Sequence, residues 1–202
     1  SYGSEPMPAS TLTRMHQIFP DVRMKQTYGL TELGAIRTKS KSSDSLWMKI
    51  GGDVHHQTKV VNGILYVRSD MAMLGYLNAE APFDEEGWYN TGDHVEVDGD
   101  YFLIQGRDCE RINVGGEKVY PAEVESVLLS IEGVEDAAVV GVPNLILGQV
   151  VEAHIYSNED QSLLTKRIKA VCKEKLEKYK RPMKIVYVDA PFCSDRFKKK
   201  RS

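Results

Sequence analysis

The run that decides the fold of this 202-residue chain is Gly87-Trp88-Tyr89-Asn90-Thr91-Gly92-Asp93, followed by Gly106-Arg107-Asp108 and then by Ile112-Asn113-Val114-Gly115-Gly116-Glu117-Lys118-Val119. The three runs place an acid, a base and a pair of glycines around one junction. Short strand patterns separated by turn signals precede the junction, and alternating helix and strand patterns follow it. We therefore expect an α+β chain whose two parts are residues 1–106 and 107–202.

Turn dipeptides organise the part before the junction. Asn62-Gly63 separates apolar runs at 58–61 and 64–67, and Asp98-Gly99 separates runs at 95–97 and 101–104. Because both dipeptides tolerate the positive φ values of tight hairpin turns, the pattern predicts two antiparallel hairpins.

The rest of this first part is less regular. Apolar residues at helical spacing predict a helix over 10–19, and a strand is expected to run into Tyr28. The Ser- and Lys-rich stretch 38–44 is typical of an exposed loop. These elements offer few partners for closing a core, so we expect residues 1–106 to be a piece of a larger domain.

The part after the junction contains a complete set of elements for a small domain. Proline at the first turn and an apolar stripe indicate the first helix, and Pro182 is expected to end the second. The pattern predicts, in order, a helix over 121–130, strands over 137–142 and 150–156, a helix over 164–179 and a strand over 184–188.

Composition restricts the class of protein. With 42% hydrophobic and 27% charged residues, the chain has the composition of a soluble globular protein. It contains no run near the roughly 18 apolar residues that span a membrane, and no secretory signal pattern, so we expect a cytoplasmic protein. Neither a disulfide framework nor a zinc site is expected from Cys109, Cys172 and Cys193, which fits a reducing compartment.

Charge and histidine placement argue against two further classes. A net charge of −3 provides no general attraction for nucleic acid, so no nucleic-acid partner is expected. His55 and His56 are adjacent, and neighbouring residues on a strand point to opposite faces, so they make a poor chelating pair.

Five motifs carry a resemblance to a known family. In chain order they are Gly3-Ser4-Glu5-Pro6, Tyr28-Gly29-Leu30-Thr31-Glu32, Asp93, Arg107 and Lys198. Their order and spacing resemble the C-terminal part of the adenylate-forming (AMP-binding) superfamily, which includes acyl-CoA synthetases, peptide-synthetase adenylation domains and luciferases. The resemblance implies that residues 1–106 are the end of the large AMP-binding domain, a sheet fragment plus a small β-barrel-like unit. Residues 107–202 would be the small, mobile, mixed α+β C-terminal domain.

The upstream motifs imply contacts with the nucleotide. By this resemblance, Tyr28 would lie against adenine, and Gly29 belongs to the same run. The other side of the base would be lined by the segment Gly3, Ser4, Glu5 and Pro6. Thr31 would hydrogen-bond the α-phosphate, and Glu32 would hold Mg²⁺, which prefers oxygen ligands. The alternative is that Tyr28-Gly29 only makes a turn from a strand into a loop.

The junction implies contacts with the sugar and with the thiol substrate. Asp93 would accept both ribose hydroxyls, and Arg107 would lie beside ribose and phosphate at the pivot between domains. Two residues later the family commonly has Asp or Lys, whereas this chain has Cys109. Gly115 and Gly116 would border the pantetheine channel, with Lys118 in a supporting role near the phosphate. Asp93 could instead be a turn residue, and the glycine pair a plain β-turn.

The tail implies the catalytic cation of the first half-reaction. Lys198 would bridge the attacking carboxylate and ATP, with Lys199 and Lys200 as alternative registers, although Phe197 replaces the family's usual glycine. The same cluster could also be a solvated basic tail or a weak targeting or nucleic-acid signal.

The resemblance implies an ATP- and Mg²⁺-dependent ligase that forms an acyl-adenylate (acyl-AMP) and passes the acyl group to coenzyme A. The alternatives are an adenylation domain that loads a carrier-protein phosphopantetheine, and a catalytically silent nucleotide-binding relative. No Ser/Thr/Gly-rich phosphate loop precedes Tyr28. We therefore expect a missing N-terminal part of the same enzyme to be a partner, and the chain alone not to be fully active.

Overall fold

The computed structural model describes residues 1–3 and 5–192. Contacts divide the chain into two compact units, the first formed by Ser1–Met7 with Leu12–Cys109 and the second by Pro8–Thr11 with the chain from Glu110 onward. The division falls after Cys109 and assigns Pro8–Thr11 to the second unit, whereas the sequence predicts a single boundary after residue 106. Helix α1 (Ala9–Ile18) matches the helix predicted over 10–19.

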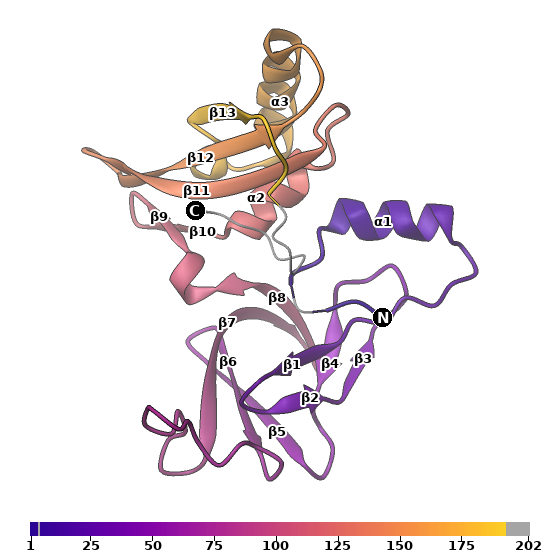
Figure 1. The fold of residues 1–202 in the computed structure, drawn as a ribbon, viewed down its shortest axis with the longest axis vertical. Helices are drawn as coiled ribbons and strands as arrows, with labels where there is room; N and C mark the ends of the chain where they lie inside the picture. The colour runs from indigo at the N-terminus through magenta and orange to yellow at the C-terminus, as the bar shows by residue number, and fades with distance from the viewer. Residues whose placement is uncertain (4, 193–202) are drawn as a thin grey trace. The chain divides into compact units, whose positions relative to one another are not determined.

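The first unit is built from short strands. They are β1 (Tyr28–Leu30), β2 (Gly34–Ile36), β3 (Thr38–Ser40), β4 (Met48–Ile50), β5 (His56–Val61), β6 (Ile64–Ser69), β7 (Trp88–Asp98) and β8 (Tyr101–Arg107), followed by a 3₁₀ turn, η1 (Asp108–Glu110). β1 and β2 form a small hairpin, and the other six make an antiparallel sheet in the order β3-β4-β8-β7-β6-β5. The sheet curls (Figure 1), and the amide of Gly52, after β4, donates to the carbonyl of His56 at the start of β5 over 3.0 Å.

Both predicted hairpins are confirmed. Val61 pairs with Ile64 across the Asn62-Gly63 turn, where Asn62 and Gly63 have φ values of 53° and 81°. Two successive positive φ values produce the turn twist that matches paired strands. The second hairpin, β7–β8, is longer than predicted because β7 begins at Trp88 and so includes the first decisive run of the sequence.

Three expectations for the first unit are wrong in part. Thr38–Ser40 is not loop but strand β3, because it pairs with β4. Thr38 is buried, and its hydroxyl donates to the Gln26 carbonyl over 2.8 Å. No strand runs into Tyr28; β1 begins there, after a single bridge between Tyr2 and Gln26. The unit also has its own core, since the unpredicted strand β4 contributes Met48 and Ile50 to a cluster with Leu65 and Val67.

The second unit is a sheet covered by helices. Its elements are β9 (Ile112–Val114), β10 (Glu117–Val119), α2 (Pro121–Leu128), β11 (Asp136–Asn144), β12 (Gly148–Tyr156), α3 (Gln161–Lys175), a 3₁₀ turn η2 (Lys178–Lys180) and β13 (Lys184–Val188). The order is β10-β9-β12-β11, and β13 pairs with β12 in parallel. α2 and α3 lie together (Figure 1), and one apolar cluster joins both helices to the sheet.

The predicted elements of this unit are present, with one correction. The helix expected over 164–179 ends at Lys175, and Tyr179 lies in the separate turn η2. Leu176 adopts an extended backbone (φ −119°, ψ 143°), so the helix ends well before Pro182. In the part of the chain that the structure describes, no helix is long and apolar enough to cross a bilayer.

Candidate nucleotide-binding site

Asp93 and Arg107 are cross-strand partners on β7 and β8. The Asp93 side chain is buried, whereas that of Arg107 is 57% exposed, and Arg107 Nε lies 3.5 Å from Asp93 Oδ1. Asp93 and Arg107 lie on opposite sides of the turn at residues 99–100, and the register of the β7–β8 hairpin brings them together. A buried carboxylate with a solvent-facing guanidinium beside it is suited to binding a polar ligand that arrives from outside.

Two further side chains hold Asp93 in place. The Tyr28 hydroxyl donates to Asp93 Oδ2 over 2.5 Å. Thr91 Oγ1 accepts from the Asp93 amide over 3.1 Å and donates to the Leu65 carbonyl over 2.8 Å. Tyr28, on β1, therefore orients the Asp93 carboxylate, and Thr91 links the Asp93 backbone to β6.

Burial governs the ionisation of Asp93 and Tyr28. Burial raises the pKa of the Asp93 carboxyl, and the hydrogen bond from Tyr28 and the charge of Arg107 partly oppose that increase. Burial, and then the neighbouring Asp93 carboxylate, raise the pKa of Tyr28 well above its usual value. The Tyr28 phenol thus stays protonated and remains a donor to Asp93.

Glu32 lies in the tight turn between β1 and β2, where the Leu33 amide donates to the Leu30 carbonyl over 3.1 Å. Its carboxylate oxygen Oε1 accepts a hydrogen bond from the Tyr76 hydroxyl over 2.5 Å. Burial disfavours the charge, but this bond and a backbone hydrogen bond outweigh burial, so the pKa of Glu32 lies below its usual value. Burial, followed by the charge of Glu32, raises the pKa of Tyr89 to about 12.

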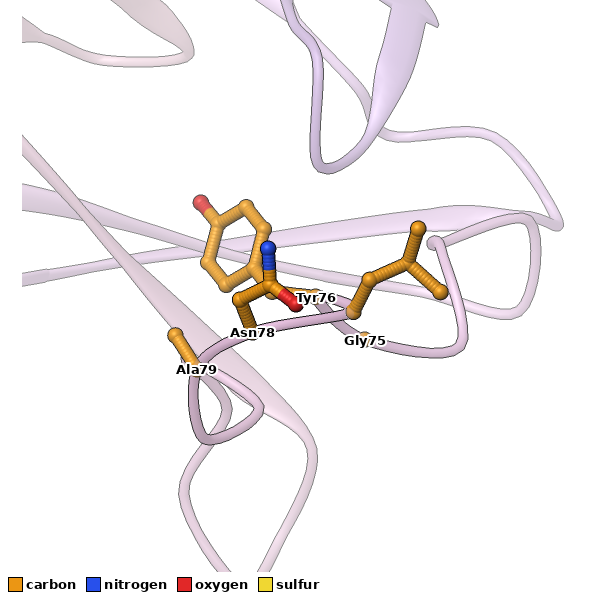
Figure 2. Close-up of a pocket in the computed structure, with 5 residues that line it drawn as sticks. Gly75, Tyr76, Asn78 and Ala79 are labelled. Atoms are coloured by element: carbon orange, nitrogen blue, oxygen red, sulfur yellow. The ribbon is translucent and has the colours of Figure 1, made fainter.

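The loop that supplies Tyr76 borders an open pocket. Residues 75–79 line this pocket of about 570 Å³, and Figure 2 shows the Tyr76 ring projecting from the loop backbone. Leu77, in the same loop, is fully exposed.

The residues present fit a magnesium ion held together with a nucleotide. Mg²⁺ in nucleotide enzymes is bound through one or two carboxylates plus substrate phosphates, so a single ionised Glu32 is a sufficient protein ligand. The described residues contain no group of three or more His, Cys, Asp and Glu able to hold a metal by themselves. His55 and His56 instead pair separately with Asp70 and Asp53, each over 3.0 Å.

The predicted N-terminal segment lies beside the chain that leads to Tyr28. The Thr27 amide donates to the Tyr2 carbonyl over 2.8 Å, and a Cβ on Gly3 would lie 2.4 Å from Thr27 Oγ1. Glu5 and Pro6 follow, and Ser4 is outside the described residues. Only a residue without a side chain allows this close approach at position 3.

Gly115 and Gly116 form the turn of the β9–β10 hairpin, with Val114 paired to Glu117. Their φ values are 60° and 95°, and the Gly116 amide donates to Asn113 Oδ1 over 3.0 Å. The local structure is thus a tight β-turn, which is compatible both with the plain-turn alternative and with a loop open to a ligand. Lys118 is exposed on β10.

The structure brings together Tyr28, Glu32, Asp93 and Arg107 within the first unit. The positive charge of Arg107 acts on two of them: it partly opposes the rise in the pKa of Tyr28 and adds to the lowering of the pKa of Glu32. Gly29 pairs with Ala35 in the β1–β2 hairpin, and Thr31 is exposed in the turn beside Glu32. Lys198, Lys199 and Lys200 lie outside the described residues, and Cys109 is exposed in η1.

Sequence reasoning missed Thr91, Tyr76 and Tyr89, which contact this cluster. Tyr89 lies in the decisive run and interacts with the Glu32 carboxylate. Thr91 lies inside the decisive run, two positions before Asp93, and that spacing is the signal that could have indicated its support of the backbone. Tyr76 lies in an irregular segment 44 residues after Glu32, and its contact is formed only by the fold.

Comparison with known proteins identifies the family. Residues 123–199 match the AMP-binding enzyme C-terminal domain. An uncharacterized acyl-CoA ligase, YhfT, of Bacillus subtilis is 32% identical over 91% of this chain, and the 2-succinylbenzoate–CoA ligase of Enterococcus faecalis is 35% identical over 80%. The chain belongs to the adenylate-forming superfamily and corresponds to its C-terminal portion.

Solved structures agree on the fold. The o-succinylbenzoate CoA synthetase MenE of Bacillus subtilis, in complex with its acyl-adenylate intermediate, is 29% identical and matches 98% of this chain with a TM-score of 0.80. The anthranilate CoA ligase AuaEII matches with a TM-score of 0.78 at 24% identity. The chain spans 40% and 36% of the two curated relatives and 43% of the MenE chain.

Proposed function

We propose that this chain is part of an AMP-forming acid–thiol ligase, which converts a carboxylic acid first to an acyl-adenylate and then to a thioester of coenzyme A. The observation that carries the proposal is the cluster formed by buried Asp93 and Tyr28, the exposed Arg107 and the ionised Glu32. The relatives support it, since they include a 2-succinylbenzoate–CoA ligase and a long-chain-fatty-acid–CoA ligase.

In the first half-reaction, a carboxylate oxygen of the acid attacks the α-phosphorus of ATP. A new oxygen–phosphorus bond forms, the bond to the bridging oxygen breaks, and pyrophosphate leaves with the bonding electrons. Asp93 would hold the ribose hydroxyls, Tyr28 and the segment near Gly3 would flank the adenine, and Thr31 would donate to the α-phosphate. Lys198 would offset the charge that accumulates at the reacting centre.

Glu32 is the residue that would hold the magnesium ion. When bound, the ion would neutralise part of the charge on the phosphate oxygens. Arg107, whose Nε lies 3.5 Å from Asp93 Oδ1, would supply a positive charge beside the ribose and phosphate.

In the second half-reaction, the thiol sulfur attacks the acyl carbonyl carbon, the bond to the adenylate oxygen breaks, and AMP leaves. The Gly115-Gly116 turn would border the path of the pantetheine arm. We infer that the second unit, from about residue 110, moves between the two steps, and that an N-terminal part with a phosphate loop completes the enzyme.

Acid-dependent ATP–pyrophosphate exchange by the complete polypeptide tests this function. Exchange is expected with at least one member of a panel that includes 2-succinylbenzoate and long-chain fatty acids, the acids named for relatives. Absence of exchange in a protein that binds AMP normally would instead support a silent nucleotide-binding relative. The 202-residue chain alone should show little exchange.

The acyl acceptor is tested separately. Coenzyme A and a phosphopantetheinylated carrier protein are offered to the preformed acyl-adenylate, and thioester formation is measured for each. Faster transfer to coenzyme A is expected, whereas transfer only to the carrier protein would assign the chain to an adenylation domain.

A further inference from the structure

The loop between β6 and β7 is attached to Glu32 at two points. The Met73 amide donates to the Glu32 carbonyl over 2.9 Å, and the Tyr76 hydroxyl donates to Glu32 Oε1 over 2.5 Å. The loop covers residues 70–87 and contains neither helix nor strand. Both contacts therefore join an irregular segment to one residue of the β1–β2 turn.

Three large side chains of the loop, Leu74, Tyr76 and Leu77, differ in what they contact. Leu74 and Leu77 are fully exposed, and Tyr76 between them is 43% exposed but directs its hydroxyl to the Glu32 carboxylate. Because so much of Tyr76 remains in solvent, burial alone does not explain why it is turned toward the turn. The hydrogen bond to Glu32 is the contact that accounts for its direction.

A hydrogen bond to one carboxylate oxygen has two consequences. It restricts rotation of a flexible Glu side chain, so less conformational entropy is lost when a ligand binds. It also directs the carboxylate, with which a second phenol, that of Tyr89, interacts as well. Residues that hold a metal-binding carboxylate in this way commonly influence metal affinity without touching the metal.

We propose that Tyr76 is the positioning residue for Glu32, and that its hydroxyl orients the carboxylate for the magnesium ion of the bound nucleotide. This inference rests on the proposed function, in which Glu32 is the protein ligand of that ion. The inference also gives the loop a role. Met73 holds the main chain of Glu32, and Tyr76 holds its side chain.

The test uses Tyr76→Phe in the complete polypeptide, because this substitution removes one hydroxyl and keeps the ring. The free Mg²⁺ concentration that gives half-maximal ATP binding, measured by calorimetry, is expected to rise about tenfold. Metal-free AMP binding is measured in the same variant and should stay within about twofold of the wild type, since AMP binding requires no magnesium.

Tyr66→Phe is the matched control. It removes a hydroxyl on β6 that accepts from Asn90 Nδ2 over 3.0 Å, a partner other than Glu32. Its magnesium requirement should equal that of the wild type. An equal rise in both variants would overturn the proposal, because the effect would then be a general consequence of hydroxyl loss.

Glu32→Gln separates failure of the inference from failure of the proposed function. If Glu32→Gln raises the magnesium requirement and Tyr76→Phe does not, Tyr76 has no positioning role while the metal role of Glu32 stands. If Glu32→Gln leaves the requirement unchanged, the metal role and the inference are both overturned. Loss of AMP binding in Tyr76→Phe would also overturn it, by showing that the hydroxyl supports the site as a whole.

Discussion

Asp93 is an acid kept in a buried position where its charged form is disfavoured. Burial raises its pKa, and only the Tyr28 hydrogen bond and the Arg107 charge limit the increase. Such a residue reduces the stability of the fold when it is ionised, so a binding role is a better explanation of its presence than a structural one. The same reasoning applies to Tyr28, whose hydroxyl is used to orient Asp93.

Asp93→Asn should separate these roles. The amide oxygen can still accept from Tyr28, but the negative charge offered to the ribose is lost. Each hydrogen bond to a charged group contributes about 1.5–3 kcal/mol, so AMP affinity should fall at least about tenfold. Calorimetric titration with AMP measures this, and Asp98→Asn, at the exposed end of the same strand, should bind as the wild type does. Unchanged AMP affinity in Asp93→Asn would remove Asp93 from the site.

The same substitution predicts a dependence of stability on pH. A folded-state pKa above the unfolded value of about 3.9 means that Asp93 contributes stability at low pH and loses it as pH rises through the folded pKa. Asp93→Asn should therefore be at least as stable as the wild type at pH 7.5, and any advantage should shrink as pH falls below the raised pKa. Urea unfolding at pH 7.5 and at about pH 4, near the unfolded pKa, measures this difference. The prediction would be contradicted if Asp93→Asn were less stable than the wild type at pH 7.5.

At the scale of single elements, hairpins position most of the candidate residues. The β7–β8 register sets Asp93 opposite Arg107, the β1–β2 turn carries Glu32, and the β9–β10 turn carries Gly115 and Gly116. Each turn is short, so its backbone conformation is restricted and the flanking side chains have defined positions. Binding groups on such turns lose little entropy when a ligand arrives.

Gly116→Ala tests the β9–β10 turn. The positive φ of Gly116 is unfavourable for alanine, so the free energy of unfolding should fall by about 1 kcal/mol. A Cβ at this position meets no atom within 4 Å and so projects into open space, where the pantetheine arm is proposed to pass. Thioester formation from preformed acyl-adenylate should therefore slow, while ATP–pyrophosphate exchange is retained.

The control for this turn is Gly99→Ala. Gly99 also has a positive φ, 58°, and open space at the Cβ position, in the turn between β7 and β8. It should lose similar stability without a change in either half-reaction. Equal thioester rates in the two variants would remove the Gly115-Gly116 turn from the acceptor path.

At the scale of the whole molecule, two units with separate cores divide the proposed chemistry. The first core contains Met48, Leu65 and Val67, and the second contains Val139, Ile155 and Leu164, with no residue in common. Each unit therefore has a core of its own, although the chain passes between the units on both sides of Pro8–Thr11 as well as after Cys109. This arrangement suits an enzyme that uses different groups for two successive steps.

Lys198→Ala should affect only one of these steps. Loss of a preorganised cation at the reacting centre costs on the order of 3 kcal/mol, so adenylate formation should fall about a hundredfold. Thioester formation from added acyl-adenylate should be unchanged. Both rates are measured by quenched-flow in the complete polypeptide, with Lys199→Ala and Lys200→Ala as controls. A loss that is larger in one of the controls would move the catalytic role to that lysine.

The amino-acid sequence by itself determined the elements whose signals are local. Asn-Gly and Asp-Gly turns predicted both hairpins of the first unit, and apolar periodicity predicted α1, α2, β11, β12 and β13, because these patterns depend on residues a few positions apart. Motif order indicated the family and a candidate site that includes Asp93 and Arg107. The helix ending at Lys175 was not predicted, because no strong stop signal precedes Pro182.

Only the tertiary structure decided the contacts between distant segments. Short strands β3 and β4 have too few residues for a periodic signal, and pairing with β8 makes β4 part of the sheet. The Tyr28–Asp93 and Tyr76–Glu32 hydrogen bonds join residues 65 and 44 positions apart. Such contacts follow from how the whole unit closes around its core, and no local pattern of residues encodes them.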